Sequence, residues 1–193
     1  MFEMEPHQFE DEVPFSFEAM DQNYNQSMLT QRWIKYFFEI ADVVAKQSKD
    51  PSTKTGAVLV SPSKQIIACG YNGFPSGYTD DEKFYDDREY KYPRIVHAEI
   101  NALCSAAKHG ISTQNASIFV VPIQICNECA KAIIQAGIKN VYCKVCKDTE
   151  KWTKAFEISK DLFTKCGVNY YTFDEDLNCF DKIHNSSHLF EDH

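Results

Sequence analysis

Apolar side chains first recur at a helical spacing between Thr30 and about Ser48. They occupy positions i, i+4, i+7, i+8 and i+11 of that segment, which is the stripe of an amphipathic helix. The apolar positions are Trp33, Phe37, Ile40, Ala41 and Val44. Thr30 precedes the stripe, and its hydroxyl is of the kind that caps free backbone N–H groups at a helix start. The pattern predicts a helix over residues 30–48 whose apolar stripe lies in the core.

Short runs rich in β-branched and aromatic residues predict five strands. The first two runs, residues 56–60 and 65–69, flank Ser61-Pro62-Ser63-Lys64, a sequence that favours a tight turn. These two runs are therefore expected to form a hairpin. The other predicted strands cover residues 117–121, 139–145 and 168–173.

Helical segments separate the later strands. They cover residues 97–108, 126–136 and 152–165. A glycine follows each of them within two residues, at the position where helices often end in a left-handed turn. Strands that alternate with helices of this length predict a layered α/β fold, with helices on both faces of one sheet.

The composition is that of one globular domain. The chain has 193 residues, of which 44% are hydrophobic and 25% charged, with only seven Gly and seven Pro. These values exclude disordered, collagenous and low-complexity proteins, and the length allows one sizeable core. No run approaches the roughly 18 consecutive apolar residues of a membrane span, and the first residues lack the features of a signal peptide. We therefore expect a cytoplasmic protein with no membrane partner.

The acidic residues are unevenly distributed. The chain has 20 Lys and Arg against 28 Asp and Glu, which gives a net charge of −8. Residues 1–28 hold seven of these acids and no Lys or Arg, so the remainder has 20 bases against 21 acids. We expect an acidic N-terminal arm over residues 1–28, either solvated or packed on a neighbouring subunit, a globular domain over 29–175 and a polar tail over 176–193. A nucleic-acid polymer is not expected as a partner, because such affinity comes mostly from Lys and Arg.

Two C-x-x-C pairs occur among the eight cysteines: Cys126 with Cys129, and Cys143 with Cys146. Together they match a four-cysteine structural zinc site, which is one interpretation. However, Cys143 and Cys146 lie at a predicted strand, where residues three apart point to opposite faces. Cys126 and Cys129 open a predicted helix, where residues three apart share a face and the N-terminus stabilises thiolates. The first pair is therefore the candidate metal site, and the second is expected to be ordinary buried cysteine.

A third candidate ligand begins another predicted helix, in the sequence His97-Ala98-Glu99. H-x-E followed by C-x-x-C is the signature of the zinc nucleobase deaminases. Two thiolates and one imidazole leave the fourth tetrahedral position of a zinc ion open to water, as in catalytic sites. Glu99 is not expected to bind metal; it would face the water and the substrate and shuttle protons. The alternative is that Glu99 only serves the positive end of its helix.

Five stretches carry a resemblance to a known family. They are SKDP at 48–51, GYNGFPSG at 70–77, KYP at 91–93, HAEINA at 97–102 and CNECAK at 126–131. Over about residues 30–173 the chain resembles the deoxycytidylate (dCMP) deaminases. The resemblance implies the three-layer α/β/α cytidine deaminase-like fold, with a five-stranded mixed sheet and helices on both faces. It also implies that residues 29–175 are a zinc-dependent deaminase domain.

The resemblance implies an activity and a set of site residues. The chain would hydrolyse dCMP to dUMP and ammonia and so supply dUMP for thymidylate synthesis. His97, Cys126 and Cys129 would bind the catalytic Zn²⁺, and Glu99 would be the catalytic proton shuttle. Asn72, at the nucleotide sugar, would contact the substrate together with Ala98.

The resemblance also implies regulation and assembly. Family members are often hexamers that dCTP activates and dTTP inhibits, usually with Mg²⁺ accompanying the nucleotide effector. We therefore expect dCTP and dTTP as effectors and a homo-oligomer, with a hexamer favoured.

One residue departs from the family pattern. The family has proline directly before the first cysteine, and this chain has Ile125. Because proline fixes φ and pre-sets the approach to the helix, its absence is expected to loosen the Cys126 loop or reshape the pocket wall. Zinc binding is expected to persist, since both sulfurs and their spacing are kept.

Three alternative functions stay open. A deaminase of a polynucleotide would use the same zinc chemistry but would need a basic or stacking surface. A deaminase of another cytosine nucleotide or nucleoside would carry the same H-x-E and C-x-x-C motifs. A catalytically silent nucleotide-sensing protein is motivated by Ile125 and opposed by Glu99.

The charged segment from Asp80 to Arg94 lies between the GYNGFPSG stretch and His97. A solvated loop is the plainer interpretation. Our hypothesis is a lid or effector-contacting segment whose bases reach phosphate. His184 and His188, four residues apart in the polar tail, are expected to be surface residues.

Overall fold

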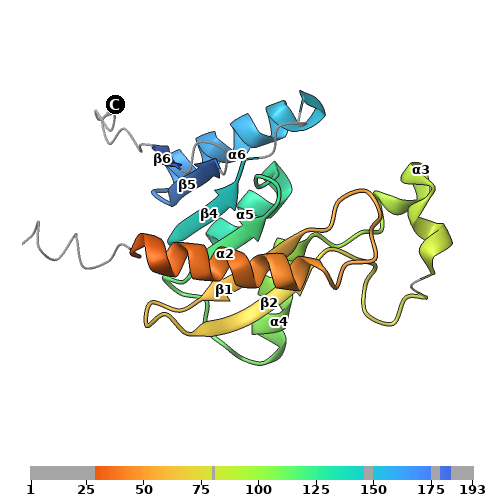
Figure 1. The fold of residues 1–193 in the computed structure, drawn as a ribbon, viewed down its shortest axis with the longest axis horizontal. Coiled ribbons are helices and arrows are strands. Elements are labelled where there is room, and N and C mark those ends of the chain that lie inside the picture. The colour runs from red at the N-terminus through yellow and green to blue at the C-terminus, as the bar shows by residue number, and fades with distance from the viewer. Residues whose placement is uncertain (1–28, 80, 146–149, 175–178, 184–193) are drawn as a thin grey trace, which may run out of the picture. The chain divides into compact units, whose positions relative to one another are not determined.

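The computed structural model describes residues 29–79, 81–145, 150–174 and 179–183, and its elements follow the predicted order (Figure 1). The strands are β1 (Gly56–Val60), β2 (Ile66–Tyr71), β3 (Ser117–Val121), β4 (Asn140–Lys144), β5 (Asn169–Asp174) and β6 (Cys179–Ile183). The helices are α2 (Gln31–Ala45), α3 (Arg88–Lys91), α4 (Ala98–Lys108), α5 (Asn127–Gln135) and α6 (Thr153–Lys165), with short 3₁₀ turns η1 (Glu82–Tyr85) and η2 (Glu150–Trp152). None of the helices in these ranges has the length and apolar character needed to cross a membrane.

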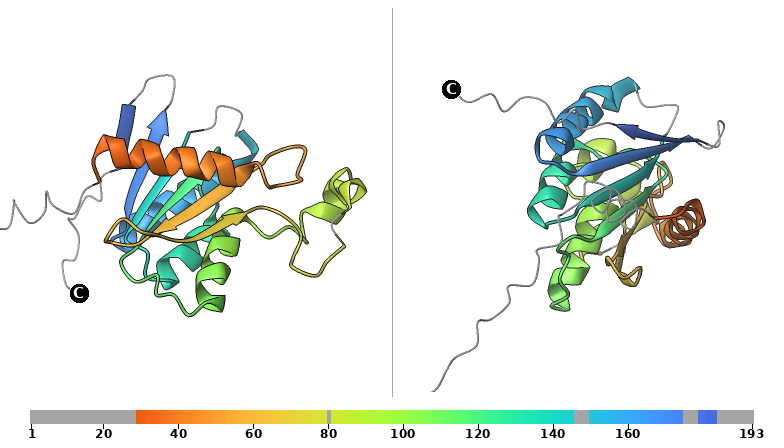
Figure 2. Two further views of the ribbon diagram at one scale, coloured as in Figure 1. Left: turned by 60° about the horizontal axis from the view of Figure 1, so that its bottom comes forward. Right: turned by 90° about the vertical axis from the view of Figure 1, so that its left-hand side faces the viewer.

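The strands form one mixed sheet in the order β2-β1-β3-β4-β5-β6. The hairpin strand β1 is antiparallel to both β2 and β3, whereas β3, β4 and β5 run parallel to one another. Parallel neighbours require a crossover, and α5 and α6 supply the two crossovers. The predicted three-layer α/β/α fold with a mixed sheet is confirmed, because helices cover both faces (Figure 2).

The five predicted strands are present, and the sheet carries one strand more. Strand β6 pairs antiparallel with β5 and lies within the segment that we predicted to be a polar tail. Its sequence, Cys-Phe-Asp-Lys-Ile, is too short and too mixed to show a clear period of two. Pairing with β5, rather than a local pattern, defines this edge strand.

Helix α2 covers one face of the sheet by itself, over a layer of aromatic rings (Figure 2). Phe119 of β3, Tyr142 of β4 and Tyr171 of β5 stack side by side, with 4.6 Å between each pair of neighbouring ring centroids. Phe37 of α2 lies 5.0 Å from Phe119, centroid to centroid, and Phe38 lies 5.5 Å from it. The helix ends at Ala45, three residues before the predicted end.

The buried stripe of α2 is rotated slightly from the predicted one. Its buried residues are Ile34, Phe37, Phe38, Ala41 and Ala45. The predicted members Trp33, Ile40 and Val44 are only partly buried. The spacing gave the correct helix, but the broad apolar surface of this segment left the centre of the stripe to be chosen by the aromatic layer beneath it.

Helices α4, α5 and α6 cover the opposite face, which is built from smaller side chains. Ala98, Ala102 and Ala106 of α4 are fully buried against this face. Gly70 of β2 allows an even closer approach, because a Cβ at that position would lie 2.3 Å from the backbone of Ala98 and Ala102. The start of α4 is therefore held directly against the end of β2.

Residues 73–96 extend beyond the sheet, at the side where Figure 1 labels α3. The segment is closed at its base by two backbone hydrogen bonds between Gly73 and Val96, of 3.1 and 2.9 Å. Its described part contains η1, α3 and a cluster of mutually packed rings: Phe74, Tyr78, Phe84, Tyr85 and Tyr90. The expectation of a plain solvated loop is therefore wrong for these residues, since the aromatic cluster gives the segment a small core of its own.

Candidate metal centre and its pocket

Three potential metal ligands meet between the first turns of α4 and α5. His97 is the N-cap residue of α4, Cys126 is the N-cap residue of α5, and Cys129 lies one turn into α5. The Nδ1 atom of His97 is 3.4 Å from Cys126 Sγ and 3.3 Å from Cys129 Sγ. All three ligand atoms lie within 4.8 Å of one another. Among the described residues they form the cluster suited to a metal ion.

The spacing of these atoms agrees with tetrahedral zinc. Zinc–nitrogen and zinc–sulfur bonds of about 2.05 and 2.3 Å place a tetrahedral nitrogen and sulfur about 3.6 Å apart. The observed nitrogen–sulfur distances, 3.4 and 3.3 Å, fall slightly below that value. The donor set, one imidazole and two thiols, is also one that zinc prefers. The residues present therefore fit a zinc ion with one position left for water.

The two helix starts leave the ligand side chains available. His97 and Cys126 both have extended backbone angles, and neither uses its side chain to cap its own helix. Cys126 and Cys129 share one face of α5 because they are three residues apart. The positive end of the helix dipole lies beside both sulfurs and favours their thiolate forms.

The protonation of the metal-free cluster shows how a cation would act on it. The hydrogen bond with Cys126 raises the pKa of His97 to about 9. The hydrogen bond with Cys129 lowers the pKa of Cys126 to about 4. Cys129 keeps its proton, because its hydrogen bond to Cys126, and then burial, raise its pKa far above the ordinary value. Zinc binding would release the protons of His97 and Cys129, leaving a neutral imidazole and two thiolates.

Glu99 lies in the first turn of α4 and is buried beside the cluster. Burial raises the pKa of its carboxyl group, and the positive charge of His97 opposes that rise. A glutamate that served only the helix dipole would be expected in solvent, whereas this one lines the same cavity as His97. A carboxyl group that holds its proton more tightly than usual is suited to taking up and passing on protons.

The cluster opens into a cavity of about 350 Å³. Its walls come from the loop between α2 and β1, the end of β2, residues 88–95, the start of α4, the loop before α5, and the start of α6. This volume is within the range of sites for small molecules. Asn72 and Ala98, the two predicted substrate-binding residues, both line it.

The segment between Asp80 and Arg94 also contributes to the cavity. Asp80 itself lies outside the described residues, but Arg88 and Lys91 of α3 both line the wall. Lys151, at the start of η2, adds a third cation. Sequence reasoning missed Lys151, because it is far along the chain from every motif and only the crossover to α6 brings it here. His184 and His188 lie outside the described residues.

Ile125 lies in the core rather than in the pocket wall. Its side chain is fully buried, and the cavity is lined by its neighbours Gln124 and Cys126 instead. Its backbone N–H, a group that proline lacks, interacts with the Cys143 thiol and the Tyr170 hydroxyl. The expectation that Ile125 reshapes the wall is therefore wrong. The residue anchors the approach to Cys126 through burial and through its amide.

The second C-x-x-C pair takes no part in the described cluster. Cys143 is buried in β4, and its thiol donates to the hydroxyl of Tyr170 at 3.3 Å. Burial raises the pKa of Cys143 to about 12, as expected for a thiol without a cation beside it. Cys146 lies outside the described residues. Cys143 is thus the ordinary buried cysteine that the strand pattern predicted.

Known proteins share both the sequence and the fold. Residues 31–145 match the family described as "Cytidine and deoxycytidylate deaminase zinc-binding region". A deoxycytidylate deaminase from Mus musculus is 38% identical over 148 residues, which cover 73% of this chain and 79% of that protein. An uncharacterized deaminase in the luxG 3′ region of Aliivibrio fischeri is 38% identical over 144 residues, or 72% of this chain and 92% of the relative. The crystal structure of a dCMP deaminase from the cyanophage S-TIM5, in complex with dCMP and dUMP, superposes with a TM-score of 0.63 at 26% identity, covering 76% of this chain and 100% of that one.

Proposed function

The chain belongs to the cytidine and deoxycytidylate deaminase family, and from this premise we propose that it is a zinc-dependent enzyme that hydrolyses dCMP to dUMP and ammonia. The observation that carries the proposal is the meeting of His97, Cys126, Cys129 and Glu99 at one end of a nucleotide-sized cavity. The relatives supply the substrate: deoxycytidylate deaminases align over most of the chain, and one structural neighbour was solved with dCMP and dUMP.

The mechanism divides the work among these residues. His97 Nδ1 and the sulfurs of Cys126 and Cys129 would hold the zinc ion, whose Lewis acidity makes water a nucleophile near neutral pH. Glu99 takes the proton that the water loses and delivers it to N3 of the cytosine ring as oxygen adds to C4. The same carboxyl group then protonates the amino group, which leaves as ammonia. Its burial serves this role, since a raised pKa lets it hold a proton between the two transfers.

The charge of the cavity supports an anionic substrate. Arg88 and Lys151 line the mouth, and neither is in an ion pair with a carboxylate among the described residues. Phosphate oxygens are the natural partners of such cations. We infer that the substrate is a nucleotide and that a nucleoside without phosphate is a poorer one. Asn72 and Ala98 contact the sugar and base side of the same molecule.

The proposal extends to regulation and assembly. It includes dCTP as activator and dTTP as inhibitor, with Mg²⁺ accompanying the effector, and a homo-oligomer with a hexamer favoured. It also includes the supply of dUMP to thymidylate synthesis and a cytoplasmic location. These features rest on the family resemblance and on the near-neutral charge outside residues 1–28.

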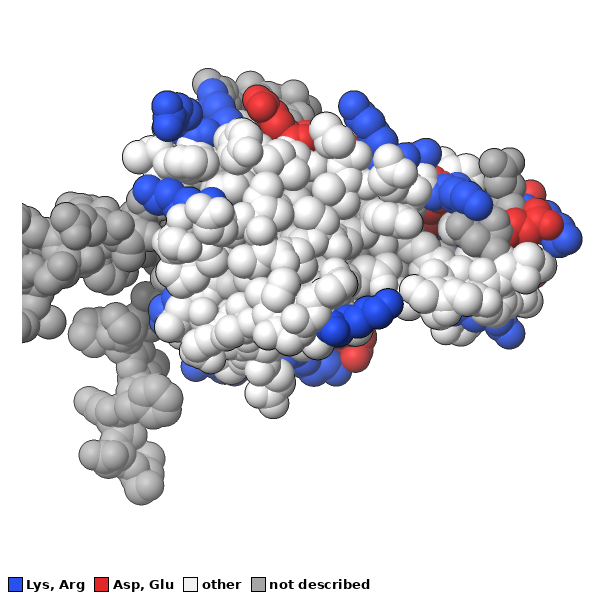
Figure 3. All heavy atoms as spheres, turned by 90° about the horizontal axis from the view of Figure 1, so that it is seen from below, with Lys and Arg blue, Asp and Glu red and all other residues white. Residues whose placement is uncertain are grey.

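A deaminase of polynucleotides is less well supported. One face of the described residues has an uncharged centre with Lys and Arg around its margin (Figure 3). This face offers no continuous basic patch of the kind that nucleic-acid binding requires. A deaminase of another cytosine nucleotide or nucleoside, or a silent nucleotide sensor, is separated from our proposal by assay.

The test uses purified protein and several substrates. We expect about one zinc ion per chain, by elemental analysis, and ammonia from dCMP. Release should be slower from deoxycytidine, dCTP and 5-substituted analogues. Glu99→Ala should keep zinc and lose turnover, while Glu157→Ala, at an exposed position of α6, should keep both. Zinc binding without turnover of any cytosine compound would support the silent sensor, and normal turnover by Glu99→Ala would overturn the mechanism.

A further inference from the structure

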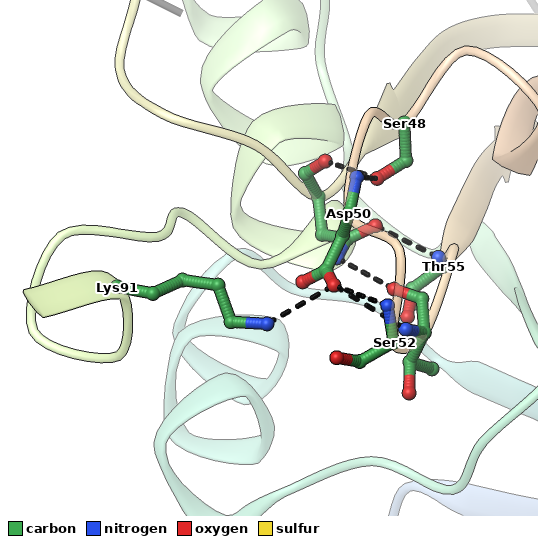
Figure 4. A network of polar contacts seen from close by, with 7 residues as sticks. Ser48, Asp50, Ser52, Thr55 and Lys91 are labelled. Carbon is green, nitrogen blue, oxygen red and sulfur yellow. Dashed lines mark hydrogen bonds and ion pairs between the residues drawn. The ribbon is translucent and has the colours of Figure 1, made fainter. Parts of the chain in front are cut away.

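A buried ion pair joins two distant segments at the wall of the cavity. Lys91 Nζ of α3 lies 3.0 Å from Asp50 Oδ1, in the loop between α2 and β1 (Figure 4). The side chains are 2% and 7% exposed. By contrast, the nearby pair of Lys83 and Asp81 has a similar length, 2.8 Å, but is exposed by 67% and 41%. Only the Lys91–Asp50 pair is withdrawn from water, and both of its members line the cavity.

Stability alone is a poor explanation for such a pair. Removing two charges from water costs several kcal/mol per ion, and the attraction between them roughly offsets that cost. An apolar pair of the same volume would often be as stable. The informative question is what the buried carboxylate holds in place, because Asp50 makes more contacts than the one to Lys91.

Asp50 organises the loop that precedes β1 (Figure 4). Its Oδ1 accepts the backbone N–H of Ser52 at 2.9 Å, besides the ammonium of Lys91. Its Oδ2 accepts from the side-chain amide of Asn72 at 3.4 Å. Ser48 ties the same parts together, because its hydroxyl donates to the backbone carbonyl of Asn72 at 2.8 Å and accepts from the N–H of Asp50 at 3.2 Å.

The side chain of Asn72 is fixed in one orientation by this loop. Its Oδ1 accepts the backbone N–H of Thr55 at 2.8 Å, and its Nδ2 donates to the backbone carbonyl of Thr53 at 2.9 Å. A backbone donor on one side and a backbone acceptor on the other leave no ambiguity between oxygen and nitrogen. The second proton of Nδ2 is directed to Asp50.

The polar capacity that Asn72 retains is therefore specific. Both amide protons are engaged, while the carbonyl oxygen has two lone pairs and one backbone partner. A ligand in the cavity can donate a hydrogen bond to Asn72 but has no amide proton to accept. In a 5′-phosphorylated deoxynucleotide, the sugar group that donates is the 3′-hydroxyl.

We propose that Lys91 and Asp50 are positioning residues that hold Asn72 Oδ1 as the acceptor for the 3′-hydroxyl of the substrate. The inference rests on the proposed function for its ligand. Without the ammonium group, the buried carboxylate of Asp50 must take up a proton or move toward water. Either change removes the acceptor for Asn72 Nδ2 and frees the amide to rotate. Because Lys91 belongs to the 73–96 segment, the pair also couples the placement of that segment to recognition of the sugar.

The first test compares dCMP with 2′,3′-dideoxycytidine 5′-monophosphate, which lacks the 3′-hydroxyl. The wild-type chain should prefer dCMP by about tenfold in kcat/KM, the value of one good hydrogen bond. Lys91→Met should reduce this preference to near unity, mainly through a raised KM for dCMP, and Asn72→Ala should do the same. The control Lys83→Met removes an exposed cation of the same segment and should keep the wild-type preference.

Other roles for Lys91 give different results. If Lys91 were merely structural, or bound the phosphate directly, both nucleotides would lose activity equally and the preference for dCMP would remain. Either result overturns the inference. Asp50→Asn, which keeps the size and the Oδ1 acceptor but not the charge, gives the same test should Lys91→Met fail to fold.

A second measurement does not depend on turnover. In the wild-type chain, the side-chain amide protons of Asn72 should exchange with water slowly in NMR spectra, because both are engaged. Lys91→Met should raise their exchange rates by at least about tenfold, as expected when a hydrogen bond of ordinary strength is lost. Rapid exchange in the wild-type chain, or no change in the variant, overturns the positioning role. A wild-type chain that keeps slow exchange but does not turn over dCMP would instead refute the proposed function.

Discussion

The two faces of the sheet solve different problems with different side chains. The face under α2 is filled by stacked aromatic rings, which bury much area and tolerate small shifts of the helix above them. The face under α4, α5 and α6 is filled by alanine and aliphatic residues, and by Gly70 where β2 meets α4. Small side chains bring the helix backbones close to the sheet, and the starts of α4 and α5 carry all three candidate metal ligands.

The contrast indicates why the chemistry lies on the alanine face. A metal site tolerates errors of only a few tenths of an ångström in the positions of its ligands. Backbone held directly against backbone, as at Gly70 and Ala98, leaves little freedom for the first turn of α4. Aromatic packing on the other face contributes stability without having to define any single atom so closely. Substitutions on the two faces should therefore separate stability from turnover.

The largest effect is expected on the alanine face at the metal cluster. Cys129→Ser removes one of two sulfurs and should lower turnover of dCMP by at least about a thousandfold, because the Lewis acid is no longer held. Zinc content, measured by elemental analysis after dialysis, should fall with it. Cys166→Ser, at an exposed position after α6, is the matched control and should change neither quantity. Retained zinc and turnover in Cys129→Ser would remove this residue from the site.

The next largest effect is expected on the aromatic face, and it should be of the opposite kind. Phe119→Ala removes the ring that contacts both Phe37 and Tyr142, and should lower the free energy of unfolding by about 3–5 kcal/mol. Denaturant unfolding measures this loss. Turnover per folded, zinc-loaded chain should stay within about twofold, since the ring is remote from the ligands. A large loss of turnover in folded protein would show that the two faces are not separable.

The close approach of β2 to α4 can be tested at Gly70. Gly70→Ala places a Cβ 2.3 Å from backbone atoms of α4, so either the strand or the helix must move. We expect a loss of about 1–3 kcal/mol in stability together with weaker zinc binding. Gly73→Ala is the control, because its Cβ would meet nothing closer than 3.8 Å. Gly70→Ala with normal zinc affinity would show that the metal site tolerates movement of α4.

The smallest effect is expected outside both faces. Lys165 and Asp161 form an ion pair on the solvent side of α6, at 3.0 Å, and their side chains are 73% and 56% exposed. Lys165→Ala should change the free energy of unfolding by less than about 0.5 kcal/mol, because water and salt screen such a pair. Zinc content and kcat/KM should be unchanged. An effect as large as that of Phe119→Ala would contradict the layered description of the core.

Much of this arrangement was predictable because it is periodic. The strand limits of β1 and β3 match the predicted ranges, and α4 and α5 begin one residue after their predicted starts. The candidate ligands were predictable for a related reason: C-x-x-C at a helix start brings both sulfurs to one side, and H-x-E adds a nitrogen and a carboxyl group. Strand β6 was missed, since an edge strand is selected by its neighbour rather than by its own pattern.

Lys91 shows where local reasoning failed. In the sequence it is one of several charges in a polar segment, and such residues are usually solvated. Nothing nearby along the chain indicates that it is buried, because its partner Asp50 lies 41 residues earlier. The SKDP and KYP stretches marked both residues as parts of a family pattern but did not indicate that they pair.

The sequence by itself determined which elements form and which side chains have the chemistry of a zinc site, because hydrophobic period, helix starts and ligand types are local properties. Only the tertiary structure decided that the starts of α4 and α5 meet, that Glu99 is buried beside them, and that Lys91 reaches Asp50. The physical reason is that each of these depends on removing water between segments distant in the chain. That removal is a result of packing across the sheet, which no single segment encodes.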